Sequence, residues 1–216
     1  LFDLPSSAQV LDVGCGCGNQ TLDWASWLDP SCNIIGVDIS EPMLALAEDL
    51  KLANHSSLQA DVSFLLGDAS EPLFPEGSVD AIYSRFGVMF FDDPVAAFAN
   101  LRRALRPDGN LGFCCWREKS ENDWINLPYQ AIRSYLPEQI EEDPYVPGPF
   151  AFARREYVSE ILGQAGFSGV QITPCDIPMS FGPSRGIQDA VKELTMTGPI
   201  AKLMADLSDD IRARAF

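Results

Sequence analysis

The chain has 216 residues, 46% of them hydrophobic and 21% charged, a composition typical of one globular domain or one domain with an appendage. Its 15 basic and 31 acidic residues give a net charge of −16, which argues against binding to nucleic acids or anionic membrane surfaces. No apolar run approaches the roughly 20 residues that span a bilayer, and no signal-peptide pattern is found, so we expect a cytoplasmic protein without membrane insertion. The chain begins at Leu1 and not at Met, so we also expect a fragment or a trimmed chain.

Short apolar segments alternate with amphipathic segments over the first half of the chain. The apolar segments lack the alternation of apolar and polar residues that is typical of a half-exposed strand, so we expect strands that are covered on both faces. Strands that alternate with helices predict parallel βαβ units with right-handed crossovers. The five predicted strands are AQVLDV (8–13), NIIGVD (33–38), VSFLLGD (62–68), VDAIYSRF (79–86) and LGFCCW (111–116).

Helical segments lie between these strands and dominate the chain after Trp116. Ser40 is suited to cap the second helix, and Pro42 is suited to its first turn. The segment RPDGN (106–110) predicts a turn before the fifth strand. We predict helices over 19–28, 42–52, 93–105, 123–135 and 155–167, a proline-rich loop or lid over 137–153, a sixth strand over 169–180, and one or two amphipathic helices over 187–216, interrupted at Gly198 and Pro199.

Three glycines separate the first predicted strand from the first helix, in the segment DVGCGCG (12–18). A glycine loop at this place lets the backbone approach a ligand closely at the carboxyl edge of a parallel sheet. The segment has no lysine for a phosphate-binding P-loop, and Asn19 and Thr21 stand where a dinucleotide fingerprint needs its third glycine. The loop therefore predicts a cofactor site and argues against a nicotinamide dinucleotide.

The segment LDVGCGCG resembles motif I of the class I S-adenosylmethionine-dependent methyltransferases. The resemblance runs from about Gln9 to Trp116, and more weakly to Ser180, through GVDIS, LLGDAS and FDDPVAAFANLRRALRPDGNLGFCCW in the family's order and spacing. Within this family, the sequence is most similar to the ubiquinone/menaquinone-type and other small-molecule methyltransferases. The resemblance implies a doubly wound α/β domain with a mostly parallel, Rossmann-like sheet in the order 3-2-1-4-5, helices on both faces and a sixth strand beyond. We predict this domain over residues 1–180, with the lid at 137–153, and a helical C-terminal segment over 181–216.

The resemblance also implies that S-adenosylmethionine lies against the loops at the ends of the strands. Asp38 corresponds to the acid that binds both ribose hydroxyls, a bidentate role that a carboxylate suits. Asp68 and the Ala69 amide correspond to the groups that meet the adenine. The further cofactor-binding residues that we predict are Asp12, Gly14, Cys15, Gly16, Ile39, Met43 and Arg85.

Three of these residues have structural alternatives. Asp12 either lies near the cationic sulfonium of the cofactor or accepts hydrogen bonds from the glycine amides. Met43 either packs on the adenine or belongs to the core. Arg85 either binds a carboxylate or forms an ion pair with Asp92 or Asp93.

The residues that would line a substrate cavity are predicted with less guidance from the resemblance. Ser84 ends the fourth strand, where family members contact the methionine part of the cofactor or the substrate. The six cysteines form no C-x-x-C pair, and His55 is the only histidine, so we predict no metal site, and the catalytic base stays unknown. The candidate substrate residues are Phe86, Trp116, Arg117 and Tyr145, and the alternative for the aromatic ones is ordinary core.

The sequence predicts a methyltransferase that converts S-adenosylmethionine to S-adenosylhomocysteine, acts on a small molecule, and is a monomer or homodimer. Two alternatives stay open, which are a non-catalytic S-adenosylmethionine-binding or scaffold domain and an NAD(P)-dependent oxidoreductase. The family's helical segment before the first strand has no counterpart here, and no seventh strand is predicted after Ser180. We therefore expect both ends of the family domain to be incomplete.

Overall fold

The computed structural model describes residues 4–136, 143–179, 186–196, 198–205, 207 and 211. The chain forms two compact units. The first unit consists of Leu1–Cys115 and Tyr145–Gln171, and the second of Trp116–Pro144 and Ile172–Phe216. Our division into residues 1–180 and 181–216 differs from this grouping and stays a prediction.

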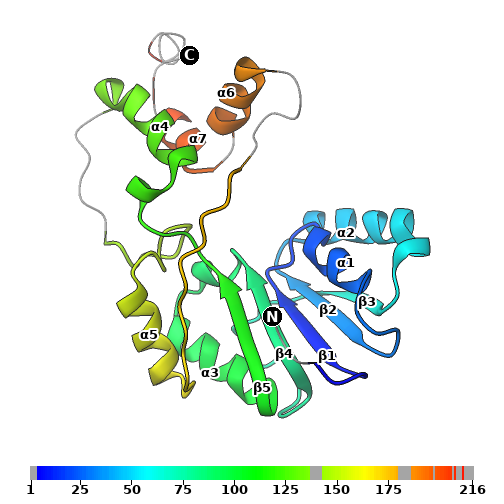
Figure 1. The fold of residues 1–216 in the computed structure, drawn as a ribbon. Helices are drawn as coiled ribbons and strands as arrows, with labels where there is room; N and C mark the ends of the chain where they lie inside the picture. The colour runs from blue at the N-terminus through cyan, green and yellow to red at the C-terminus, as the bar shows by residue number, and fades with distance from the viewer. Residues whose placement is uncertain are drawn as a thin grey trace. The chain divides into compact units, whose positions relative to one another are not determined.

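The first unit is built on a parallel sheet in the order β3-β2-β1-β4-β5, which confirms the predicted order of the first five strands (Figure 1). The turn predicted at RPDGN lies inside the last strand, where the pairing passes from Val79–Leu105 to Ala81–Asn110 through an irregularity. The strands are β1 (Gln9–Val13), β2 (Asn33–Asp38), β3 (Asp61–Leu66), β4 (Val79–Arg85) and β5 (Leu105–Cys114).

Helices of the first unit follow the strands as predicted and pack in two pairs, α1 with α2 and α3 with α5. Ser40 is at the N-cap of α2 but makes no side-chain cap hydrogen bond, whereas the Asp93 carboxylate accepts one from the Ala96 amide at 3.0 Å and begins α3. The elements are α1 (Asn19–Ala25), α2 (Glu41–Asn54), α3 (Pro94–Ala104), α5 (Arg155–Gln164) and the 3₁₀ turns η1 (His55–Ser57) and η2 (Val88–Phe90).

The core of the first unit consists of the central strands and the helix faces that cover them. Leu11, Ile34 and Ile82 are completely buried, as is Phe98 of α3. Burial of each such side chain stabilises the fold by about 1.5–3 kcal/mol. These strands read as continuous apolar runs because the central strands are covered on both faces.

The second unit is helical, with α4 (Asp123–Ile132), η3 (Lys119–Glu121), η4 (Arg133–Tyr135), α6 (Ile187–Met196) and α7 (Gly198–Ala205). Helices α4, α6 and α7 contact one another. Helix α6 ends at Met196 and α7 begins at Gly198, so Gly198 and Pro199, where we predicted an interruption, are the first residues of α7. None of the helices in the described ranges is long and apolar enough to cross a bilayer.

The predicted sixth strand is wrong for the residues that the structure describes, because 170–179 form no strand. Pro174 and Pro178 lack the amide hydrogen that a ladder requires, so a strand here would miss two donors within five residues. Of the proline-rich lid, 143–153 contains turns and no helix or strand, and 137–142 lie outside the described residues.

Candidate functional site

The glycine loop leaves the carboxyl end of β1 in a conformation that favours glycine. Gly14, Gly16 and Gly18 have φ values of +69°, +55° and +75°. The amides of Gly14 and Cys15 donate to the Val37 carbonyl at 2.8 and 3.1 Å, which carries the pairing with β2 past the end of the strand. Among the described residues, a Cβ atom at Gly16 would meet the Met43 methyl alone within 4 Å, at 3.3 Å. The backbone at Gly16 is thus open to close approach by a ligand.

Asp38 joins the glycine loop to the start of α2. Its Oδ2 accepts a hydrogen bond from the Gly16 amide at 2.8 Å, and its Oδ1 accepts one from the Ser40 amide at 2.9 Å. Each carboxylate oxygen has a second lone pair, so both can accept a further hydrogen bond. The half-buried carboxylate is therefore held in place and can still bind two hydroxyl groups.

Asp12 lies beneath the loop and is only 2% exposed. The hydroxyls of Thr21 and Tyr83 both donate to its Oδ2, at 2.5 and 2.6 Å. Burial raises the pKa of Asp12 to about 6, although these hydrogen bonds and the charge of Arg85 favour the ionised form.

The glycine amides do not donate to Asp12, so that alternative is wrong. Gly14 donates to Val37, Gly16 to Asp38, and Gly18 to the Cys15 carbonyl. A direct contact between Asp12 and a cofactor stays a prediction.

Two apolar side chains stand exposed beside the loop. Ile39 is 75% exposed and Met43 is 41% exposed, so the core alternative for Met43 is wrong. Asp68 is exposed, and its Oδ1 accepts from the amide and hydroxyl of Ser70 at 2.9 and 2.7 Å, while Ala69 is buried. This arrangement offers an apolar surface and a carboxylate near the ends of β2 and β3.

The end of β4 contributes an exposed cation. Arg85 makes no ion pair with Asp92 or Asp93 in the described part of the chain, so that alternative is wrong. Phe86, the next residue, has a φ of +66°. Cys15, between the glycines, has a pKa well above its usual range because the thiol is desolvated and lies near Asp12 and Asp38. A neutral thiol is a poor nucleophile, so Cys15 contributes shape and not reactivity.

The four candidate substrate residues are divided between the units. Tyr145 belongs to the first unit with Phe86, and its ring centroid lies 4.2 Å from that of Tyr157. Trp116 and Arg117 belong to the second unit, where the Trp116 ring lies 5.0 Å from that of Trp124.

Arg117 forms ion pairs with Glu121, at 3.4 Å, and with Asp176. A substrate role for any of the four candidate residues stays a prediction.

The residues that hold the glycine loop and Asp12 in place were not identified from the sequence. Thr21 and Tyr83 converge on Asp12, and Gly87 lies against Gly14. Hydroxyls inside an otherwise apolar helix face and strand, and a glycine directly after the fourth strand, were the signals that could have found them.

Comparison with known proteins finds methyltransferases that are similar to the part of the chain that carries this site. Residues 11–113 match the family described as methyltransferase domain. The chain is 37% identical to nocamycin O-methyltransferase of Saccharothrix syringae over 112 residues, which are 52% of this chain and 39% of that protein. It is 28% identical to demethylmenaquinone methyltransferase of Lactobacillus johnsonii over 176 residues, 78% of this chain and 71% of that protein.

A similar fold occurs in the crystal structure of the YcgJ protein of Bacillus subtilis, with a TM-score of 0.60 and 19% identity over 98% of this chain and 83% of that chain. The chain spans less than half the length of the nocamycin enzyme. The matched residues contain the glycine loop and most of the five strands, which have the order 3-2-1-4-5. Over residues 11–113 this chain is therefore similar to methyltransferase domains.

Proposed function

We propose that this protein transfers a methyl group from S-adenosylmethionine to a small-molecule acceptor. The observation that carries the proposal is Asp38, whose two oxygens are fixed by the amides of Gly16 and Ser40 at the open side of the glycine loop. A carboxylate held in this way suits the two ribose hydroxyls of a nucleoside. The site requires no phosphate-binding lysine, because this cofactor has no phosphate.

The other residues of the carboxyl edge fit the remaining parts of the cofactor. The exposed side chains of Ile39 and Met43 would cover an adenine ring, and Asp68 with the Ala69 amide would meet its polar edge. Arg85 would bind the carboxylate of the methionine part, because it is exposed and has no acidic partner in the described residues. The direct contacts of Asp12, Gly14 and Cys15 belong to the same proposal.

The chain's own contribution to the reaction would be alignment and exclusion of water. The bound cofactor supplies a methyl group on a good leaving group, so the protein must hold acceptor and donor in line. Alignment of this kind is worth roughly 7–11 kcal/mol of a reaction barrier. We nominate no general base, and we propose substrate-contacting roles for Phe86 and Tyr145 of the first unit and, separately, for Trp116 and Arg117 of the second unit. We further propose a cytoplasmic monomer or homodimer.

Calorimetry with S-adenosylmethionine, S-adenosylhomocysteine and NADH tests the cofactor. We expect the first two to bind and NADH to show no heat of binding. Binding of NADH alone would make the protein an oxidoreductase candidate and overturn the proposal. Transfer of labelled methyl groups to a metabolite pool then separates an enzyme from a scaffold that only binds the cofactor, with Asp38→Ala as the inactive control.

A further inference from the structure

The last two residues of β1 are held from both faces of the sheet by two adjacent residues of β4. The Tyr83 hydroxyl donates to Asp12 Oδ2 at 2.6 Å, and the Ser84 hydroxyl donates to the Val13 carbonyl at 2.6 Å. Successive side chains of a strand point to opposite faces, so the two bonds lie on the two sides of β1. Both act directly before Gly14, where the glycine loop begins.

The Ser84 side chain also holds the turn that follows β4. The Gly87 amide donates to Ser84 Oγ at 3.2 Å, so one buried hydroxyl bonds both to β1 and to this turn. Between Ser84 and Gly87, Phe86 has a φ of +66°. A bulky residue in this conformation costs about 1–3 kcal/mol and persists only where its surroundings determine it.

Gly87 and Gly14 are in direct backbone contact. A Cβ atom at Gly87 would lie 2.6 Å from the Val13 carbonyl oxygen and 2.9 Å from Gly14 Cα, and one at Gly14 would lie 2.7 Å from Gly87 Cα. The φ of Gly87 is −89°, which any residue adopts. Gly87 is therefore glycine because of space and not because of conformation.

We propose that Ser84 and Gly87 are positioning residues of the cofactor site, which hold the Gly14–Gly16 backbone in its binding geometry before a ligand arrives. The place of Ser84 at the end of the strand suggested a contact with the cofactor or the substrate. Because Ser84 is only 1% exposed, it acts instead through Val13 and Gly87. This inference rests on the proposed function, because it concerns the same site.

Ser84→Ala and a matched control separate positioning from stability. Ser78 precedes β4, and its hydroxyl donates to the Pro75 carbonyl at 2.7 Å, so Ser78→Ala removes the same kind of bond at the opposite end of the strand. We expect Ser84→Ala to weaken S-adenosylhomocysteine binding by about tenfold, because only a fraction of the molecules then present a competent loop. Ser78→Ala should leave affinity within about twofold.

A second pair of variants tests the glycine contact. A Cβ atom at Gly163, in α5, would meet no atom of the described residues within 4 Å, whereas the methyl group of Gly87→Ala meets the backbone of the loop. Gly87→Ala should weaken S-adenosylhomocysteine binding by about tenfold or more, since the loop must move to make room. Gly163→Ala should bind normally.

The readout is the dissociation constant of S-adenosylhomocysteine, measured well below each variant's unfolding midpoint. A purely structural loss leaves this constant unchanged while nearly all molecules are folded. Folded Ser84→Ala and Gly87→Ala variants that bind within about twofold of the wild type would overturn the inference. If Gly87→Ala does not fold, the dissociation constant of Ser84→Ala alone decides whether the inference stands. A wild-type protein that binds no S-adenosylhomocysteine would instead refute the proposed function.

Discussion

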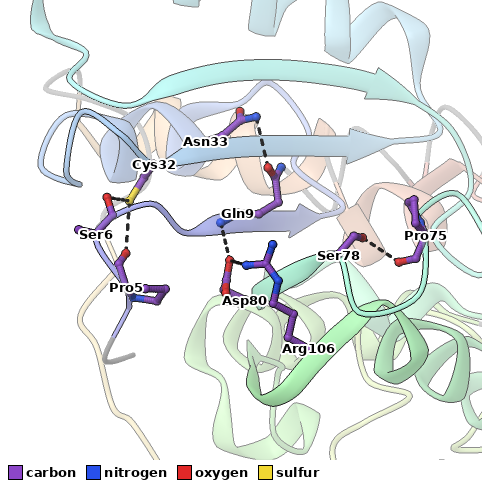
Figure 2. Close-up of polar contacts among 9 residues, drawn as sticks. All are labelled: Pro5, Ser6, Gln9, Cys32, Asn33, Pro75, Ser78, Asp80 and Arg106. Carbon is purple, nitrogen blue, oxygen red and sulfur yellow. Dashed lines mark hydrogen bonds and ion pairs between the residues drawn. The ribbon is translucent and has the colours of Figure 1, made fainter.

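The two edges of the parallel sheet use polar side chains in opposite ways. At the amino edge, the Gln9 amide donates to Asp80 at 2.8 Å, and Asp80 forms an ion pair with Arg106 (Figure 2). Nearby, Asn33 donates to the Gln9 side chain at 3.3 Å, and the Cys32 thiol points to the Ser6 carbonyl at 3.7 Å. At this edge the negative charge of Asp80 is paired with the positive charge of Arg106, and the polar groups of the edge bond to one another.

At the carboxyl edge the charges are held but not neutralised. Asp38 accepts from two amides, Asp12 accepts from two hydroxyls, and Arg85 has no acidic partner in the described residues. Ligands of open α/β sheets bind outside the carboxyl ends of the strands. The comparison teaches that one edge is arranged for stability and the other keeps the charged groups of Asp38 and Arg85 available, so equivalent substitutions should have different consequences.

The largest effect is expected from Gly14→Ala. An alanine at a φ of +69° is strained by about 1–2 kcal/mol, and its Cβ would lie 2.7 Å from Gly87 Cα. We expect S-adenosylhomocysteine affinity to fall by about 100-fold or more. Gly77→Ala near the amino edge is the control, because Gly77 has a φ of +61° but its added Cβ would meet no described atom within 4 Å. It should lose stability and keep affinity; equal losses of affinity in both variants would contradict the comparison.

A change in the pH dependence of stability is expected from Asp12→Asn. The pKa of Asp12 is about 6 in the folded protein and near 3.8 when unfolded, so the folded state binds the proton more tightly. Its contribution to stability is therefore full below about pH 4 and is lost as the pH rises to about 6, by at most about 3 kcal/mol.

Urea unfolding of wild type and Asp12→Asn at several pH values measures this difference. Subtraction removes the titration of the other carboxyl groups. The wild type should lose stability relative to the variant between pH 4 and pH 6. Above that range the free energies of unfolding of the two proteins should change with pH in parallel. Parallel curves throughout would show that Asp12 has an ordinary pKa.

Asp38→Ala should weaken S-adenosylhomocysteine binding by at least about tenfold, because two charge-assisted hydrogen bonds are lost, each worth about 1.5–3 kcal/mol. The free energy of unfolding should fall by about 1 kcal/mol, since the amides of Gly16 and Ser40 lose their acceptor. Asp38→Asn should be milder. Affinity within about twofold in a folded Asp38→Ala variant would mean that no ribose lies at this carboxylate.

The smallest effect is expected at the amino edge from Asp80→Asn. The ion pair with Arg106 is half-exposed, so its loss should lower the free energy of unfolding by about 0.5–1 kcal/mol. S-adenosylhomocysteine affinity should not change, because the pair lies at the far end of the strands. Titration calorimetry and thermal unfolding of this variant and of Asp38→Asn complete the comparison, and a loss of affinity in Asp80→Asn would remove the distinction between the edges.

The sequence by itself determined the first four strands of the sheet, the place of the glycine loop and the position of Asp38, whereas β5 begins at Leu105 and not after the predicted turn at 106–110. These features depend on local information, because apolar runs, turn residues and glycine spacing act over a few residues. The order of the strands came from the family resemblance. The sixth strand was mispredicted because its apolar residues outweighed Pro174 and Pro178, which a ladder does not tolerate.

Only the tertiary structure decided what each polar group of the site touches. Asp12 bonds to Tyr83, 71 positions away, and the Ser84 hydroxyl bonds to the Val13 carbonyl over the same separation. Such partners depend on the register of β1 against β4, which no local pattern specifies. The contact of Gly14 with Gly87 has the same origin, because a glycine that is needed for space looks in the sequence like a glycine that is needed for a turn.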